Sequence, residues 1–139
     1  MLARDGFGVK PLYYARYSDR LVFASQPKAI VGDPTFRRRL SASAFGSFLA
    51  FGYVPHDQAI FERMAKLPAG HFALFEESRL SIFRYTQDTA CAPFATPGEA
   101  EDGVDSALRG AIAAQLVSDV PVGCFLSGGV DSSAVAAAL

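Results

Sequence analysis

The sequence predicts an α+β fold over residues 1–88 and the opening of an α/β domain after it. Two observations support the first part. Short segments rich in aromatic and branched residues have the composition of strands, and turn residues join them in pairs. One observation supports the second part: a helical apolar pattern is followed by an apolar run, two glycines and an alanine-rich segment. The order helix, strand, loop, helix is typical of a parallel α/β sheet.

The first predicted strands are residues 2–3, 12–17 and 21–24, and the last two form a hairpin around 18–20. The connection after the first strand contains two glycines and a proline, so it should be a compact loop that presents Asp5 at a strand end. A carboxylate there can accept hydrogen bonds from an ammonium group. The alternative is that it pairs with the preceding arginine or accepts N–H groups of its own loop.

A helix is predicted over Ser41 to Phe51, with Ser41 as N-cap and Gly52 as the stop. A second hairpin is predicted from His71–Glu76 and Arg79–Tyr85. The many phenylalanines are interpreted as core of this first part. Neither histidine is expected to act as a base, because no orienting group accompanies His71 or the second histidine, at position 56.

Two prolines and small polar residues without apolar periodicity mark a boundary near residues 86–97. We therefore predict domains at 1–88 and 99–139, joined by a linker at 89–98. Thr96 to Glu99 has the pattern of a capping box with proline at the first helical position. The following helix should carry an apolar stripe.

The segment after that helix is the most informative. Residues 122–126 are apolar and are predicted to form a strand buried on both faces. The glycines at 128–129 allow close approach of a ligand to the backbone, and a helix start at 132–133 offers free N–H groups to an anion. Asp131 would repel phosphates unless a cation such as Mg²⁺ lay between them. This pattern favours ATP with Mg²⁺; the alternative is that Asp131 and the serines only cap the helix. The loop has neither a Walker lysine nor a dinucleotide-binding glycine pattern.

The charge and cysteine content limit the classes of partner and the compartment expected for this protein. The formal net charge is −1, from 13 basic and 14 acidic residues, which argues against a nucleic-acid partner. The short run Arg37–Arg39 is interpreted as a solvated turn. Cys91 lies in the linker and Cys124 in the apolar run, where it is expected to pack as a small core residue. Their unlike settings suggest no disulfide framework, which favours a reducing compartment and a cytoplasmic protein. The sequence contains no apolar run of about 18 residues, so no membrane span is predicted.

Residues 127–133, Ser-Gly-Gly-Val-Asp-Ser-Ser, resemble the pyrophosphate loop of ATP pyrophosphatases, and together with 115–123 they closely resemble the glutamine-hydrolysing asparagine synthetases. The segment 4–14, Arg-Asp-x-x-Gly-x-Lys-Pro-Leu-Tyr-Tyr, is similar to the late part of class II glutaminase domains. The resemblance implies the C-terminal part of an N-terminal-nucleophile-type αββα glutaminase sandwich. It further implies the first strand, loop and helix of a parallel α/β ATP pyrophosphatase domain. Gly6 and Gln26 depart from the family pattern, in which a bulkier residue and a glutamate are usual.

The resemblance implies a ligase that adenylates the side-chain carboxyl of aspartate with ATP and then aminates it with ammonia from glutamine. Asp5 would hold the α-amino group of glutamine, and Asp131 would hold Mg²⁺. Phe125 and Leu126 would meet the nucleoside through their backbone. The residues implied for ATP and pyrophosphate are Phe125, Leu126, Ser127, Gly128, Gly129, Asp131, Ser132 and Ser133.

The family nucleophile is an N-terminal cysteine, and residue 2 here is leucine, so no catalytic residue is expected in this chain. We therefore expect an internal fragment of a longer enzyme, inactive by itself. The partners implied are glutamine, ATP and aspartate, and the resemblance allows a homodimer of the whole enzyme. Two alternatives stay open: a related amidotransferase that acts on another carboxylate, and a non-catalytic ATP-binding module.

Overall fold

The computed structural model describes residues 1–55, 58–87 and 92–139. The chain divides into two compact units, Met1–Asp88 and Thr89–Leu139, and each is described by itself. The interpretations of the histidine at position 56 and the cysteine at position 91 fall outside the described residues. The first unit mixes helices and strands, in agreement with the α+β class predicted for residues 1–88, whereas the described part of the second unit holds helices and no strand.

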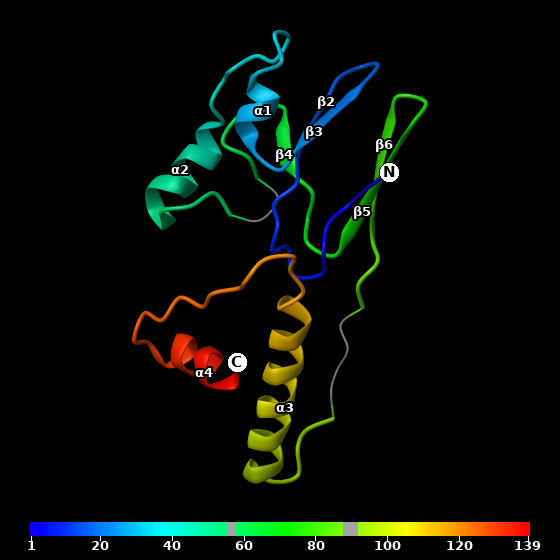
Figure 1. Cartoon of the computed structure of the whole chain (residues 1–139). Coiled ribbons are helices and arrows are strands. Elements are labelled where there is room, and N and C mark those ends of the chain that lie inside the picture. Colours follow the sequence, from blue (N-terminus) through cyan, green and yellow to red (C-terminus); the bar gives the residue numbers. More distant parts are fainter. Residues whose placement is uncertain (56–57, 88–91) are drawn as a thin grey trace. The chain divides into compact units, whose positions relative to one another are not determined.

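Two antiparallel three-stranded sheets make up the first unit (Figure 1). One has the order β1-β5-β6, with bounds Leu2–Ala3, His71–Glu76 and Arg79–Arg84. The other has the order β3-β2-β4, with bounds Leu21–Ala24, Tyr13–Arg16 and Met64–Lys66. Both predicted hairpins are confirmed, because β2 pairs with β3 and β5 with β6. Strand β4 was not predicted.

The β5–β6 hairpin is tight. Glu77 and Ser78 have φ angles of 48° and 61°, and such left-handed pairs turn a strand back with the right twist. The register places Phe72 opposite Phe83, and their rings stack with centroids 5.2 Å apart. Cross-strand aromatic pairs of this kind stabilise a sheet.

Two helices complete the first unit. Helix α1 (Pro27–Val31) begins with proline after Gln26, whose side chain makes no capping hydrogen bond, and it buries Ile30 completely. Helix α2 (Ala42–Phe51) confirms the predicted ends: Ser41 Oγ accepts the N–H of Ala44 at 3.4 Å, and Gly52 closes the helix at φ +75°.

The core of the first unit is small and lies around α1 and the β3-β2-β4 sheet. Its buried members are Ala15, Ile30, Phe36, Ala59 and Met64. Phe36 and Phe61 meet edge to face at 6.0 Å. The interpretation of the phenylalanines as core is wrong for α2, whose Phe45, Phe48 and Phe51 are exposed.

The second unit contains α3 (Pro97–Gln115) and α4 (Val130–Ala138). Helix α3 begins as predicted. Thr96 Oγ1 accepts the N–H of Glu99 at 3.2 Å, and Glu99 reaches back to the N–H of Ala95 at 2.9 Å. No residue of α3 is fully buried, although Leu108 and Ile112 of its apolar stripe are half-buried.

The predicted strand at residues 122–126 is not found. A strand exists through hydrogen bonds to a neighbouring strand, and no residue of the described part of the chain pairs with this segment. Cys124 is exposed rather than packed in a core, so that expectation is also wrong. Within the described ranges, no helix is long and apolar enough to cross a bilayer.

Candidate functional site

The loop after β1 is organised by the Asp5 side chain. Its Oδ1 accepts the backbone N–H groups of Phe7 at 3.1 Å and Val9 at 3.0 Å, and its Oδ2 accepts that of Lys10 at 3.5 Å. Of the possibilities left open by the sequence, the carboxylate therefore bonds to its own loop. The Val9 N–H is the main cause that lowers the pKa of Asp5 below its usual value. The exposed carboxylate thus stays negatively charged.

Arg4 does not pair with Asp5. Its guanidinium donates to three backbone carbonyls, those of Lys10 at 3.0 Å, Leu67 at 2.8 Å and Gly8 at 2.8 Å. Gly8 has φ +67°, and a Cβ there would lie 2.8 Å from Arg4 Nη2. The arginine therefore holds the loop closed, and glycine is needed beside it.

Two further bonds fix the loop to the β5–β6 hairpin. The N–H of Gly70, just before β5, donates to the carbonyl of Asp5 at 2.8 Å, and the Tyr85 hydroxyl donates to the carbonyl of Arg4 at 2.7 Å. The Asp5 carboxylate is thus presented by a supported loop, and within the described ranges its Oδ2 accepts only the long contact from Lys10. Sequence reasoning missed the role of Arg4; the signal available was a cation inside a loop bounded by glycine and proline.

His71 begins β5 as expected, and its Nδ1 lies 2.7 Å from the carbonyl of Ala69. This contact ties the ring to the adjacent turn. That His71 does not act as a base stays a prediction from the sequence.

The second candidate site is the turn into α4. Gly128 has φ +81° and Gly129 is the N-cap, without a side-chain capping bond. Ser127 Oγ lies 3.0 Å from Ser132 Oγ, which also donates to the carbonyl of Gly129 at 3.1 Å. The alternative in which Asp131 and the serines cap the helix is therefore wrong, because glycine occupies that position. Among the residues that the structure describes, no side chain accepts a hydrogen bond from the first-turn N–H groups.

Asp131 stands in the first turn of α4 and is exposed. A Cβ added at Gly128 would meet no atom within 4 Å, so the surface of the turn is open. An open helix start with uncapped N–H groups suits an oxyanion. The neighbouring carboxylate suits a cation that is shared with that oxyanion.

Residues 122–125, α3 and α4 line an apolar hollow of about 370 Å³. Phe125 lines it and is 98% exposed, and Leu126 is 66% exposed. Ile112 and Val135 contribute from the two helices. Of the predicted nucleoside segment, only Phe125 is among the residues that line this hollow.

The described residues offer few ligands for a metal ion at this turn. In residues 1–55, 58–87 and 92–139, no three His, Cys, Asp or Glu side chains gather in an arrangement that could hold a metal ion. Asp131 could therefore supply only one carboxylate, with phosphate oxygens and water supplying the rest. Mg²⁺ in nucleotide sites is commonly held in this way.

With both loops described, the comparisons with known proteins define the class. The family described as "Glutamine amidotransferase domain" matches residues 1–86, and the family described as "Asparagine synthase" matches residues 103–139. The chain therefore belongs to the glutamine amidotransferase domain family, and its last 37 residues are similar to the asparagine synthase family.

Particular relatives agree with this class. The chain is 34% identical to asparagine synthetase [glutamine-hydrolyzing] 3 and 32% identical to asparagine synthetase [glutamine-hydrolyzing] 1, both of Bacillus subtilis. It is 30% identical to the putative asparagine synthetase [glutamine-hydrolyzing] 2 of Methanocaldococcus jannaschii. These matches cover 94–97% of the chain but only 21–27% of the relatives. The chain thus spans about a fifth to a quarter of their length, and the predicted resemblance is confirmed.

Proposed function

We propose that the protein carrying these residues makes asparagine from aspartate, with ATP and with ammonia released from glutamine. One observation carries this proposal. A glutamine amidotransferase match and an asparagine synthase match follow each other on a single chain, and relatives named as glutamine-hydrolysing asparagine synthetases align with 94–97% of it. The glutaminase part would end near residue 88, the linker would be 89–98, and the synthase part would begin at 99. The two sheets of the first unit would belong to an αββα sandwich.

On the glutamine side, Asp5 would bind the α-amino group. Its carboxylate is kept ionised by loop N–H groups, and Oδ2 keeps acceptor capacity for an ammonium. A charged hydrogen bond of this kind is shorter and stronger than a neutral one. The role of Asp5 would be to orient glutamine, while the bond to nitrogen is broken by a nucleophile that is not among these residues.

On the ATP side, the turn Ser127–Ser133 would hold the β- and γ-phosphates, and Asp131 would share Mg²⁺ with them. An aspartate side-chain oxygen attacks the α-phosphorus, and pyrophosphate leaves, which gives β-aspartyl-AMP. Ammonia then attacks the acyl carbon, AMP leaves with the C–O bond electrons, and a proton is lost to solvent. Main-chain N–H groups around Gly128 and Gly129 would stabilise the negative charge that develops on pyrophosphate. The backbone of Phe125 and Leu126 would meet the nucleoside.

The same proposal places the enzyme in the cytoplasm and allows a homodimer. Cell fractionation tests the first statement. Light scattering of the purified enzyme tests the second.

The two sites can be separated by changing the source of nitrogen. In the enzyme that carries this chain, Asp5→Asn should raise the KM for glutamine about tenfold or more, since a charge-assisted bond is lost, and should leave asparagine formation from added ammonium salt intact. Asp131→Ala should abolish turnover with either nitrogen source. Asparagine is quantified by chromatography in all four reactions.

Asp102→Asn is the matched control, because Asp102 is exposed on α3 and outside both loops. It should behave as the unchanged enzyme. Equal losses with glutamine and ammonium after Asp5→Asn would contradict the glutamine role. Full ATP-dependent turnover after Asp131→Ala would contradict the assignment of the turn.

A further inference from the structure

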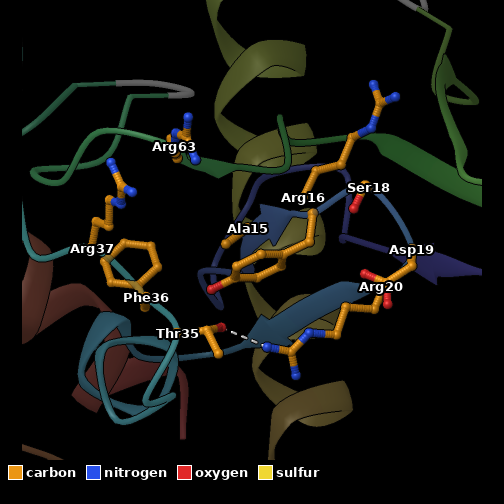
Figure 2. Close-up of a pocket in the computed structure, with 10 residues that line it drawn as sticks. Ala15, Arg16, Ser18, Asp19, Arg20, Thr35, Phe36, Arg37 and Arg63 are labelled. Atoms are coloured by element: carbon orange, nitrogen blue, oxygen red, sulfur yellow. Dashed lines mark hydrogen bonds between the residues drawn. The ribbon is translucent and has the colours of Figure 1, made fainter.

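A hollow of about 670 Å³ lies in the first unit, and no residue of the Asp5 loop lines it. Figure 2 draws the residues that line it. It forms where β2, the β2–β3 turn, the segment 35–37 and the turn before β4 meet. Four arginines from these separate segments line it: Arg16, Arg20, Arg37 and Arg63. The only acidic residue among the lining side chains is Asp19. Folding therefore concentrates positive charge in one concave place.

Two of these arginines are already engaged. Arg20 binds the Asp33 carboxylate at 2.9 Å and Thr35 Oγ1 at 2.7 Å, and its guanidinium lies 4.7 Å from the centre of the Tyr17 ring. Arg16 donates to the carbonyl of Ser78 at 3.2 Å. These bonds orient the two guanidinium groups, so that part of the hollow is preorganised.

The other two arginines, Arg37 and Arg63, differ from these because they make no such contacts in the described part of the chain. Across residues 1–55, 58–87 and 92–139, neither the Arg37 nor the Arg63 guanidinium has a hydrogen-bond or ion-pair partner, and both residues are exposed. Arg63 also has φ +62°, a region that residues other than glycine seldom adopt and that is often found at functional sites. Unpaired guanidinium groups around one hollow are suited to an oxyanion.

Tyr17 adds an independent observation. It lines the same hollow, and its hydroxyl is buried without a hydrogen-bond partner among the described residues. Buried polar atoms in folded proteins are nearly always paired, so an unpaired one requires an explanation. A ligand oxygen that reaches this hydroxyl would provide the missing acceptor.

We propose that this hollow binds a small phosphorylated molecule or free phosphate. A phosphate dianion presents several oxygens in different directions and can accept from guanidinium groups on opposite walls together with a phenol. The volume suits a small molecule, since ligand pockets span about 300–1,000 Å³. The site is independent of the glutamine and ATP sites proposed above, because its residues belong to neither loop.

The test is a titration of the ¹⁵N-labelled chain with inorganic phosphate at constant ionic strength, followed by backbone amide and arginine Nε–H signals. We expect saturable shifts at residues 16–20, 35–37 and 63. The double variant Arg37→Gln with Arg63→Gln should bind about tenfold more weakly or worse, because charge-assisted bonds are lost. Its thermal midpoint should not change, since both side chains are exposed and unpaired. Tyr17→Phe should weaken binding severalfold without lowering that midpoint.

Arg38→Gln is the matched control. It removes the same charge next to Arg37 from a side chain that does not line the hollow, and it should bind phosphate as the unchanged chain does. Equal weakening by Arg38→Gln would overturn the proposal in favour of diffuse charge attraction. Shifts that never saturate, or that saturate only at 127–133, would also overturn it. Equal affinity for the dicarboxylate succinate would overturn the phosphate class, and unchanged affinity in Tyr17→Phe would remove the hydroxyl from the site.

Discussion

The carboxylate of Asp5 and the backbone N–H of Val9 are joined by a hydrogen bond of 3.0 Å that spans the loop after β1. The Asp5 side chain therefore stabilises the loop and is also the exposed group that the loop presents. A carboxylate that accepts main-chain N–H groups has a lower pKa, so its charge and its fold are coupled.

This coupling predicts an acid sensitivity. Because the pKa of Asp5 is lower in the folded chain than in the unfolded chain, the carboxylate contributes stability above its unfolded pKa of about 4, and this contribution is lost as the pH falls through the folded pKa. Asp5→Asn cannot titrate, so its thermal midpoint should depend less on pH below about 4. Thermal unfolding followed by circular dichroism between pH 2 and 7 measures this.

Asp102→Asn serves as the control, because no hydrogen bond or ion pair of its side chain is found in the described part of the chain. It should retain the pH dependence of the unchanged chain. If the two variants had the same pH profile, the hydrogen bonds to Asp5 would not contribute to stability.

Replacing glycine by alanine should have opposite effects on stability at Gly8, which lies beside Arg4, and at Gly46 in α2. Gly8→Ala should destabilise the chain by about 1–2 kcal/mol or more, because φ +67° is unfavourable for alanine and the new methyl group would lie against the Arg4 guanidinium. Gly46→Ala, inside α2 with no neighbour within 4 Å, should stabilise it by up to about 1 kcal/mol. Chemical denaturation of both variants gives the comparison. Stabilisation by Gly8→Ala would show that the loop is not held as described.

Substitution of the buried residue of α1 should show how strongly the stability of the first unit depends on its small core. Ile30 is fully buried, whereas Leu49 in α2 is 69% exposed. Ile30→Ala should cost about 2–5 kcal/mol through lost burial and a cavity, while Leu49→Ala should cost well under 1 kcal/mol. Urea unfolding measures both. Similar losses would mean that α2 is covered in solution, in contrast to its exposed phenylalanines here.

Local signals in the sequence predicted those elements whose cause is itself local. Ser41 and Gly52 delimit α2, and Thr96 with Glu99 starts α3, because a cap is made by residues three or four positions apart. Strand β4 escaped prediction because it is only three residues long and exists through pairing with β2, about 50 residues earlier in the chain. The strand predicted at 122–126 was wrong for the same reason, because an apolar run indicates burial but does not supply a partner strand.

In the candidate site, too, local features were predictable from the sequence and features that depend on tertiary structure were not. The sequence predicted a tight turn at the glycines 128–129 and a helix start at 132–133; the structure has the turn, but α4 begins earlier, at Val130, with Gly129 as its N-cap. Ligand binding by this turn and by Asp5 stays a prediction. The hollow lined by Arg37 and Arg63 could not be predicted, because its arginines converge only through tertiary structure, and the short arginine run suggested no more than a solvated turn.

The turn into α4 yields a prediction that isolates backbone conformation from steric hindrance. Gly128 has φ +81°, yet a Cβ at this position would meet nothing within 4 Å. Gly128→Ala should therefore act only through the backbone, with a conformational cost of about 1–2 kcal/mol that turns the N–H groups away from the phosphates. In the enzyme that carries this chain, the Kd for ATP with Mg²⁺, measured by calorimetry, should rise about tenfold. Gly98→Ala is the matched control, because its Cβ would be equally free, its φ is not positive and it does not line the hollow beside Phe125, so the Kd should stay unchanged. If the two alanine variants bound ATP equally well, the left-handed turn would have no part in holding phosphate, and the role proposed for Asp131 would require another support.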